Sequence, residues 1–412
     1  MRVAMATEYF WPYDFGGSEW STYYLAKKLQ KAGHKIIIVT PSYGKQPPKE
    51  KEELQVVRFP FFKKIRNKKT LTPFWHTNIF WILTTTYYLI KICRRNRIEI
   101  LHLQGKYFAP AGFFVKHLLG IPVIITARDY QLVCNYGFCL WSKNTSCDIR
   151  EYFFKDFKMY IDSYIFQKNP ISYLVNFVYA LRGRAVRNMY KYFATKLNKV
   201  VCISKAEAEI YKNNGFKNVS VIYNPMDFKS NHSKTKNKIV YAGRLTPGKG
   251  IDLLIKAFEK VILEYPKLKL EVYGEGFLKN YLKTHVPKSI IKNVVLKGHI
   301  SHQDLLKQLS NSLVAIMPSV WPEPFGRVAL EAISQGTPAV VTKVGGLPEI
   351  VDNGITGYIC SPTPDDLSKS IKEALAENDS LRKKIKLAQP LLRQKFEIEN
   401  TNQYIEMYKS LI

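Results

Sequence analysis

Two glutamates separated by seven residues mark the most informative stretch of the chain, Pro318–Ala332. Glu323 lies just before an expected helix that begins near Gly326, and Glu331 lies about one and a half turns into that helix, at 3.6 residues per turn. The free backbone N–H groups at a helix start favour an anion such as a diphosphate. Glu331 can accept hydrogen bonds from a ribose, and Glu323 would face an attached sugar. The spacing alone is a weak signal, but together with the strand-to-helix junction at Phe325-Gly326 it predicts a site for a sugar joined to a diphosphate.

Two cations stand in a loop rich in glycine and proline, YAGRLTPGKG, between an expected strand and the expected helix Ile251–Glu259. Arg244 and Lys249 suit a diphosphate, because a guanidinium can bind phosphate oxygens in a forked geometry. The loop lacks the spacing and the Ser/Thr of a P-loop, so Mg²⁺-dependent nucleotide hydrolysis is not favoured. Solvated loop charges in a lysine-rich chain are the alternative interpretation.

A glycine pair, Gly16-Gly17, lies between the first expected strand and the first expected helix. Glycine lets the backbone approach a ligand closely, and the helix start attracts anions. The pattern is not GxGxxG, which disfavours a nicotinamide site. A purely structural turn is the alternative.

Two charged residues, Arg128 and Asp129, follow the expected strand Val123–Thr126. Arg128 can bind a phosphate or a sugar, but it cannot act as a base at neutral pH. His102 lies in the expected strand Glu99–Leu103 and is expected to be structural.

Three cysteines, Cys134, Cys139 and Cys147, follow this segment with the spacing C-x4-C-x7-C. With a fourth ligand they could hold zinc. No CxxC pair is present, so ordinary thiols are expected and no metal site is assigned. Six cysteines in 412 residues exclude a disulfide scaffold and favour a reducing compartment.

These residues must be positioned by alternating strands and helices, which predict an α/β fold of two doubly wound domains. The continuous β-branched runs are typical of parallel strands covered on both faces. We expect an N-terminal domain at 1–228, a C-terminal domain at 229–390 and a final helix at 391–412. The expected strands are Met1–Thr7, Lys35–Thr40, Glu99–Leu103, Val123–Thr126, Lys199–Ile203, Val219–Ile222, Ile239–Ala242, Leu268–Tyr273, Val294–Lys297, Leu313–Met317 and Pro338–Thr342.

The charge of the chain is strongly positive, +29 at pH 7. Residues 1–230 carry 36 basic and 15 acidic side chains, so most of the excess lies in the N-terminal half. Such a surface attracts anions, from nucleic acid to phospholipid headgroups. The hydrophobic fraction of 46% excludes a largely disordered chain.

An insertion at about 135–195 is dense in aromatic and basic residues. It is either an ordinary amphipathic helical insertion or an interfacial surface, where rings lie at headgroup level. The stretch Leu71–Ile90 has no charged side chain, but His76, Pro73 and several threonines argue against a membrane span. The first residues contain no signal-like apolar core, which predicts a cytoplasmic protein.

The chain resembles glycosyltransferase family 4 in its ordered motifs GGSE, GRLTPGKG and EPFGRVALEAISQGTPAVVTKVGGLPEIV. The resemblance runs across most of the chain and is strongest from Ile239 to Cys360. It implies the GT-B fold, in which two Rossmann-like domains face a cleft and the last helix returns to the N-terminal domain. Many members carry a His-Asp pair where this chain has Arg128-Asp129.

The resemblance also implies roles for single residues. Arg244 and Lys249 would hold the diphosphate, Glu331 the ribose, and Glu323 the transferred sugar, while His299 would lie near the nucleobase or in a surface turn. The catalytic set is then Glu323, Arg244, Lys249 and Asp129. The donor-binding set is Gly16, Gly17, Arg128, Gly243, His299, Phe325, Gly326, Arg327, Val328 and Glu331.

The activity implied is that of a retaining, metal-independent glycosyltransferase, with no cofactor and with a UDP- or GDP-sugar as donor. The acceptor is expected to be a sugar or a lipid-linked glycan or glycolipid precursor. The basic N-terminal domain would contact an anionic membrane at its cytoplasmic face. A sugar-nucleotide epimerase of the same fold is the alternative. A nucleic-acid-binding protein is disfavoured, because no recognition motif is present and the two glutamates would have no purpose.

Overall fold

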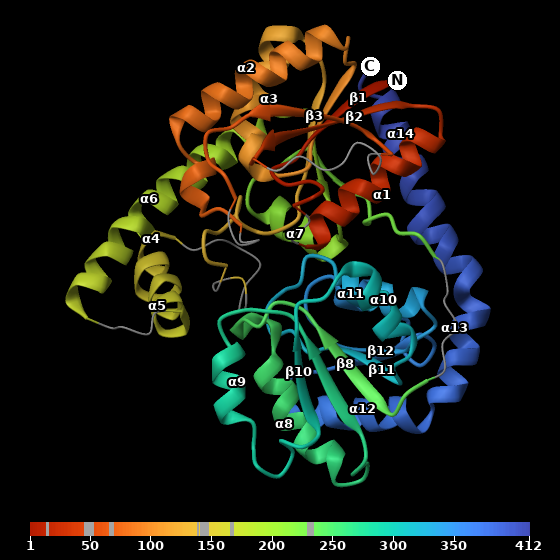
Figure 1. Ribbon diagram of the computed structural model, residues 1–412. Coiled ribbons are helices and arrows are strands. Elements are labelled where there is room, and N and C mark those ends of the chain that lie inside the picture. The colour runs from red at the N-terminus through yellow and green to blue at the C-terminus, as the bar shows by residue number, and fades with distance from the viewer. Residues whose placement is uncertain are drawn as a thin grey trace. The chain divides into compact units, whose positions relative to one another are not determined.

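The computed structural model describes residues 1–13, 16–44, 53–65, 70–137, 140, 148–164, 169–228 and 235–412. The chain forms two compact units (Figure 1). Unit 1 comprises Met1–Ile161, Gln167–Met226 and Phe396–Ile412. Unit 2 comprises Asp162–Phe166 and Asp227–Lys395.

Unit 1 is built on a parallel sheet with the strand order β3-β2-β1-β4-β5-β6-β7. The apolar runs that predicted strands are buried in it, because helices cover both faces of such a sheet. Its strands are β1 (Arg2–Ala6), β2 (Lys35–Ser42), β3 (Gln55–Pro60), β4 (Ile100–Leu103), β5 (Val123–Thr126), β6 (Lys199–Cys202) and β7 (Val219–Val221).

Helices connect these strands and include the expected insertion. They are α1 (Gly17–Lys31), α2 (Ile79–Arg95), α3 (Ala109–Leu119), α4 (Ile149–Glu151), α5 (Lys158–Tyr164), α6 (Pro170–Thr195) and α7 (Lys205–Asn213). Short helical turns lie at Pro73–His76 and Lys106–Phe108, and a π-helical turn lies at Tyr152–Phe157. No helix in the described ranges combines the length and the apolar character that a membrane span requires.

The last helix of the chain, α14 (Asn400–Lys409), belongs to unit 1. Its side chains Tyr404 and Tyr408 are buried in one cluster with Leu25 and Leu29 of α1 and with Met5 of β1. The expected return of the final helix to the N-terminal domain is confirmed.

Unit 2 contains a second parallel sheet, with the order β10-β9-β8-β11-β12-β13. Its strands are β8 (Lys238–Ala242), β9 (Lys269–Tyr273), β10 (Val294–Gly298), β11 (Val314–Met317), β12 (Ala339–Thr342) and β13 (Gly357–Cys360). Its helices are α8 (Ile251–Ile262), α9 (Lys279–His285), α10 (His302–Ser310), α11 (Arg327–Ser334), α12 (Pro364–Ala376) and α13 (Asn378–Arg393). Turns of 3₁₀ helix lie at Pro247–Lys249 and Leu347–Glu349, and a π-helical turn, Gln394–Glu399, follows α13.

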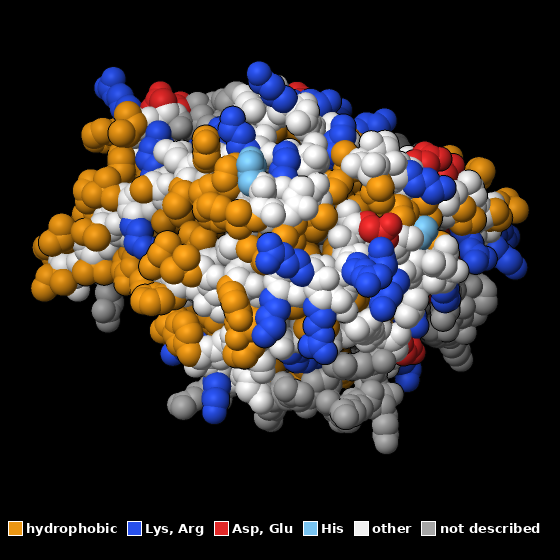
Figure 2. Space-filling model, turned by 90° about the horizontal axis from the view of Figure 1, so that it is seen from above, with side chains coloured by type: hydrophobic (Ala, Val, Ile, Leu, Met, Phe, Trp, Pro, Cys, Tyr) orange, Lys and Arg blue, Asp and Glu red, His pale blue; other side chains and the backbone are white. Residues whose placement is uncertain are grey.

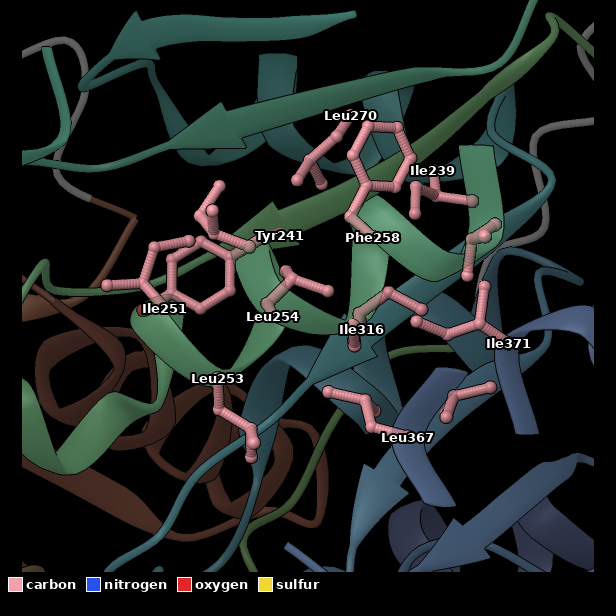
Figure 3. Packing of buried hydrophobic residues seen from close by; sticks show 14 of the residues in the cluster. Ile239, Tyr241, Ile251, Leu253, Leu254, Phe258, Leu270, Ile316, Leu367 and Ile371 are labelled. Carbon is pink, nitrogen blue, oxygen red and sulfur yellow. The ribbon is translucent and has the colours of Figure 1, made fainter. Parts of the chain in front are cut away.

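The core of unit 2 lies between this sheet and helices α8 and α12. Figure 3 shows Leu254 and Phe258 of α8 packed beside Ile239 of β8, with Ile316 of β11 and Ile371 of α12 nearby. All five side chains are fully buried. This packing fixes the ends of β8 and β11, from which the predicted site loops leave.

Each sheet has a point at which its strand order reverses. In unit 1 this switch lies between β1 and β4, and in unit 2 it lies between β8 and β11. Ligands of open α/β sheets bind beyond the carboxyl ends of the strands at such a point. The fold therefore directs attention to the residues that follow β1, β4, β8 and β11.

Candidate active site

The loops after β8 and β11 of unit 2 are joined by their backbones. The N–H of Val320 donates a 3.0 Å hydrogen bond to the carbonyl oxygen of Gly248. Gly250 has a φ of 66°, and a Cβ atom there would lie 1.8 Å from the carbonyl oxygen of Pro318. Only glycine allows this approach, so the glycines of the loop GRLTPGKG bring it against the segment that carries Glu323.

The Lys249 ammonium lies 2.6 Å from Oε1 of Glu323. The same oxygen accepts hydrogen bonds from the Ser319 hydroxyl, at 2.6 Å, and from the Trp321 indole, at 3.0 Å. Burial raises the pKa of Glu323, but the Lys249 charge and these hydrogen bonds outweigh it and hold the pKa below its usual value. Oε2 accepts no hydrogen bond from the described residues, so one carboxylate oxygen can still bind a ligand hydroxyl.

The second predicted cation, Arg244, is the second residue after the end of β8. Its carbonyl oxygen accepts a 3.0 Å hydrogen bond from the Tyr241 hydroxyl, which fixes the backbone. Its guanidinium is exposed and forms no ion pair with any residue that the structure describes. The neighbouring N–H of Gly243 donates to the carbonyl oxygen of Tyr273, at 3.0 Å. Arg244 therefore supplies a positive charge in the same loop as Lys249, and no described acidic side chain pairs with it.

Helix α11 begins directly after the loop that carries Glu323. Gly326 precedes it with a φ of 104°, and a Cβ atom there would lie 2.5 Å from Cδ2 of Leu347. Phe325 is buried, and Arg327 and Val328 are the first residues of the helix. The N–H of Ala329, in the first turn, donates a 3.0 Å hydrogen bond to the carbonyl oxygen of Gly326. A helix start favours an anion through its dipole, so this position agrees with the predicted diphosphate site.

The loop after β12 contacts the backbone of Glu323. Gly345 follows β12 with a φ of 53°, and a Cβ atom there would lie 2.2 Å from the carbonyl oxygen of Glu323. The N–H of Gly346 donates a 2.7 Å hydrogen bond to that oxygen. The GG turn of the motif VGGLPE therefore positions the Glu323 backbone.

The second glutamate, Glu331, lies on α11 with its Oε1 held by two donors. Arg327 Nε lies 2.7 Å away and His302 Nε2 lies 2.9 Å away. Burial raises the pKa of Glu331, and the Arg327 charge together with the His302 hydrogen bond lowers it below its usual value. The carboxylate is therefore ionised and oriented in the absence of a ligand.

The sequence directed attention to His299 and passed over His302. His299 is exposed in the turn after β10, while His302 is the first residue of α10 and contacts Glu331. Both histidines are in the segment KGHISHQD. They differ because α10 begins after Ser301, so that His302 is in the helix and His299 is in the loop before it. Ser301 caps this helix by accepting a hydrogen bond from the Asp304 N–H.

In unit 1, Gly16 caps α1 and Gly17 is its first residue, and both are exposed. The N–H of Gly16 donates a 2.9 Å hydrogen bond to Oε2 of Glu19. Burial raises the pKa of this carboxyl group to about 7. The motif GGSE therefore carries a titratable group that the sequence analysis did not single out.

The predicted pair Arg128-Asp129 lies after β5 in unit 1. Arg128 donates to Oδ1 of Asn224, at 2.7 Å, and to Oε1 of Gln104, at 2.5 Å. The Asp129 carboxylate forms an ion pair with Lys106. Arg128 is thus held rigidly by two amide oxygens.

Two charged residues at the switch between β1 and β4 were not identified from the sequence: Glu8 and Lys106. Oε1 of Glu8 accepts a 3.1 Å hydrogen bond from the N–H of Tyr107, and burial raises its pKa although Lys106 opposes this. Glu8 follows β1 and Lys106 follows β4, so their places after adjacent strands were the signal that could have found them.

His102 has the structural character expected of it. Its Nδ1 lies 2.7 Å from the Tyr408 hydroxyl and its Nε2 lies 2.7 Å from the Thr126 hydroxyl. Burial lowers its pKa well below the usual value, so the ring is neutral. Of the three clustered cysteines, Cys134 is a buried thiol, and Cys139 and Cys147 lie outside the described residues. The described ranges hold no group of three or more His, Cys, Asp and Glu placed to bind a metal.

Comparisons with known proteins cover both units. A family model described as Glycosyltransferase Family 4 matches residues 15–230, and one described as Glycosyl transferases group 1 matches residues 224–389. The phosphatidylinositol N-acetylglucosaminyltransferase GPI3 subunit of Saccharomyces cerevisiae is 26% identical over 398 residues, which cover 91% of this chain and 75% of the yeast protein.

Solved structures are similar over the whole chain. Anabaena HepE in complex with UDP-glucose has a TM-score of 0.67 and 18% identity, with 100% of both chains covered. Sucrose-phosphate synthase from Thermosynechococcus elongatus has a TM-score of 0.69 and 17% identity, with 100% of this chain and 98% of the synthase covered. The predicted fold class, α/β of the GT-B type with two Rossmann-like sheets, is confirmed.

Proposed function

Because the chain belongs to glycosyltransferase family 4 and is a glycosyltransferase, we propose that it transfers a sugar from a nucleoside diphosphate sugar to an acceptor hydroxyl, with retention of configuration. The observation that supports this most is the contact of Lys249 with Glu323 beyond β8 and β11. It joins a cation for the diphosphate and a carboxylate for the sugar at the switch point of one sheet.

The donor would be bound along this line of residues. The diphosphate would lie against Lys249, Arg244 and the first turn of α11, including the backbone of Arg327 and Val328. Glu331, ionised and oriented, would accept from the ribose. Oε2 of Glu323, which is not engaged by the described residues, would accept from a hydroxyl of the sugar, with Gly243 and the Phe325-Gly326 backbone beside it.

The reaction requires the bond from the anomeric carbon to the diphosphate oxygen to break while the bond to the acceptor oxygen forms. Negative charge then grows on the leaving diphosphate, and cations placed there beforehand stabilise it without reorganisation. We propose that the acceptor attacks from the face that the diphosphate leaves, and that its hydroxyl proton passes to the departing phosphate oxygen. No side chain of unit 2 is then needed as a nucleophile, and the cations take the place of a metal.

The nucleobase and the acceptor are proposed more narrowly from the relatives. The structure of HepE is a complex with UDP-glucose, which favours a UDP-sugar over a GDP-sugar here. The name of the yeast relative specifies transfer of N-acetylglucosamine to a phosphatidylinositol. Together with the basic N-terminal half, this favours a lipid-linked acceptor at the cytoplasmic face of a membrane. Gly16, Gly17, Arg128 and Asp129 are the residues of unit 1 that we assign to substrate binding.

The test begins with thermal shifts of the full chain against UDP, GDP and their sugars, because a ligand bound only by the folded state raises the melting temperature. The Glu331→Ala variant should bind its nucleotide more weakly by about 1–3 kcal/mol, the loss typical of a hydrogen bond to a charged group. Glu264→Ala, an exposed glutamate of the same unit, is the control. Release of nucleoside diphosphate only in the presence of an acceptor identifies transfer; isomerised donor without release identifies an epimerase and contradicts the proposal.

A further inference from the structure

Three helices of unit 1 leave large apolar side chains in solvent. We define the outer helical face by Phe80, Leu83 and Tyr87 of α2, Leu118 of α3, and Leu174 and Val178 of α6. Each of these side chains is between 57% and 68% exposed. More than half of the exposed large hydrophobic side chains in the described part of the chain lie on these helices. Clusters of this kind in a folded protein mark an interaction surface.

The spacing of these residues shows that they form coherent stripes. On α2 the exposed apolar residues recur at Ile79, Phe80, Leu83 and Tyr87, which is one side of a helix. The opposite side of α2, with Trp81 and other residues, is buried in the unit. The helix therefore has an apolar inner side and a second apolar side that no described residue covers.

The helices α2, α3 and α6 are packed against one another, α3 contacting both of the others. The Phe193 ring of α6 lies 5.1 Å from that of Phe113 of α3. Arg182 of α6 donates to the carbonyl oxygen of Thr77, just before α2, at 3.0 Å, and lies over the Phe74 ring. The three helices that carry the outer helical face are thus packed together.

The charge of this surface is of one sign. The three helices contain no Asp or Glu. They contain eight basic residues: Lys91, Arg94, Arg95, Lys116, Arg182, Arg184, Arg187 and Lys191. Of these, Arg187 is buried and the other seven are partly or fully exposed. Figure 2 shows hydrophobic side chains gathered on the side of unit 1 that carries α6, with Lys and Arg among them and few acidic side chains in view. The Lys91 ammonium lies 5.9 Å from the centre of the Tyr87 ring, so cations and rings share the surface.

We propose that the outer helical face docks on an anionic phospholipid bilayer, with its apolar side chains in the headgroup region and its cations against lipid phosphates. Aromatic and aliphatic side chains enter this interface, and lysine and arginine hold it to anionic lipid. A second copy fits poorly, because a twofold contact would oppose two surfaces of equal positive charge. Nucleic acid fits poorly, because its phosphates offer nothing to exposed leucine, valine and phenylalanine.

The inference deepens the proposed function, since it names the surface by which a transferase for a lipid-linked acceptor would reach its substrate. It is tested by flotation of the full chain with vesicles of phosphatidylcholine, with and without a minor fraction of phosphatidylglycerol. The wild-type chain should float with the anionic vesicles, and added salt should release it. Binding that is equal with and without phosphatidylglycerol, or absent at low salt, overturns the proposal.

Variants locate the surface. Phe80→Ser with Leu83→Ser, and separately Arg94→Glu with Arg95→Glu, should each lower the bound fraction about tenfold. All four side chains are exposed, so the melting temperature should not change. The matched control is Leu263→Ser with Leu387→Ser, two leucines of unit 2 that are 82% and 81% exposed. A control that loses as much binding as the Phe80 variant overturns the assignment.

The remaining outcomes separate this surface from the catalytic proposal. Vesicle binding without sugar transfer leaves the surface in place and defeats the proposed function. Transfer to a detergent-solubilised acceptor without vesicle binding does the reverse. A chain that ignores vesicles but forms a dimer that Phe80→Ser with Leu83→Ser dissociates would show a protein interface, and the lipid proposal would be wrong.

Discussion

The Lys249 ammonium and the Glu323 carboxylate form an ion pair, so each neutralises the charge of the other. The carboxylate is mostly buried, and a buried charge without a partner is costly. The pair therefore keeps both groups ionised and in place, with the ammonium held where a diphosphate would meet it. Binding of a donor would replace part of this attraction by contacts to phosphate.

Replacing Lys249 should affect turnover and stability by separate routes. In the proposed site, Lys249→Ala removes the cation that would stabilise the leaving diphosphate, so kcat should fall about 10²–10³-fold, the usual loss for one preorganised electrostatic contact. The same change leaves Glu323 without its cation, raises its pKa and lowers the melting temperature. The double variant Lys249→Ala with Glu323→Gln should recover the melting temperature but not kcat.

Steady-state kinetics and thermal unfolding of these two variants check this prediction. Lys260→Ala is the control, because Lys260 pairs with Asp365 at an exposed position in the same unit. Turnover at the wild-type rate in Lys249→Ala would show that Lys249 does not stabilise the diphosphate. Recovery of kcat in the double variant would mean that an unpaired Glu323 caused the defect.

Glu19 offers a pH-dependent prediction at the start of α1. Its folded pKa of about 7 lies above its unfolded value, so between these values the folded chain binds more protons than the unfolded chain. The free energy of unfolding should then decrease as the pH rises through this interval, by at most about 1.4 kcal/mol per pH unit. Glu19→Gln retains an acceptor for the Gly16 N–H and should remove this dependence.

Melting temperatures of wild type and Glu19→Gln between pH 5 and about pH 8 test the sign. The control is Glu53→Gln on the same unit, because the Lys27 hydrogen bond holds the pKa of Glu53 below its usual value and its effect lies at lower pH. Equal slopes for wild type and Glu19→Gln would contradict the prediction.

At the scale of elements, the loop between β8 and α8 depends on one glycine. Gly250→Ala would place its Cβ atom 1.8 Å from the Pro318 carbonyl oxygen and would strain a φ of 66°. The backbones must then separate, and we expect a loss of about 2–4 kcal/mol in the free energy of unfolding, combining overpacking with left-handed strain. The displacement should also lower turnover, because it moves Lys249.

The control for this element is Gly336→Ala. Gly336 has a φ of 78°, but a Cβ atom there meets nothing within 4 Å, so only the strain of about 1–2 kcal/mol remains. Urea unfolding of both variants gives the comparison. Equal losses would show that the close approach of the two loops does not matter.

The elements were more predictable than the contacts between them. Runs such as Lys35–Thr40 and Val123–Thr126 are β-branched over their whole length, and burial on both faces of a parallel sheet requires that. The strands β3 and β13 were missed, because Gln55–Pro60 contains Arg58 and Gly357–Cys360 begins with glycine. A sheet edge tolerates such residues, so their pattern is weak.

The same distinction applies to the candidate site. Glu323, Glu331 and Lys249 could be identified because glycine-rich turns and a helix start surround them in sequence. The partner of Glu331 could not, because a shift of a few residues in the start of α10 decides whether His299 or His302 faces it. Glu8 and Lys106 become neighbours only through the pairing of β1 with β4, so the strand order of the sheet, and no local pattern, could have identified them.

At the scale of the whole molecule, the first unit is completed by the last residues of the chain. Tyr404, Met407 and Tyr408 are buried in its core, and the Tyr408 hydroxyl bonds to His102. Burial of each large side chain contributes about 1.5–3 kcal/mol. The contribution of the three together is therefore comparable with the net free energy of unfolding of an ordinary domain. Unit 2, in contrast, has its core within Asp227–Lys395.

Fragments should therefore behave differently. Residues 227–395 should unfold cooperatively and gain thermal stability from UDP, because both the core and the proposed donor site lie within them. Residues 1–226 should lack cooperative unfolding when produced alone and should regain it when a peptide of residues 396–412 is added, since the peptide supplies the missing part of the core. Calorimetry of the two fragments, with a sequence-scrambled peptide as control, decides the matter: a fragment 1–226 that unfolds cooperatively without the peptide would show that α14 is dispensable for unit 1.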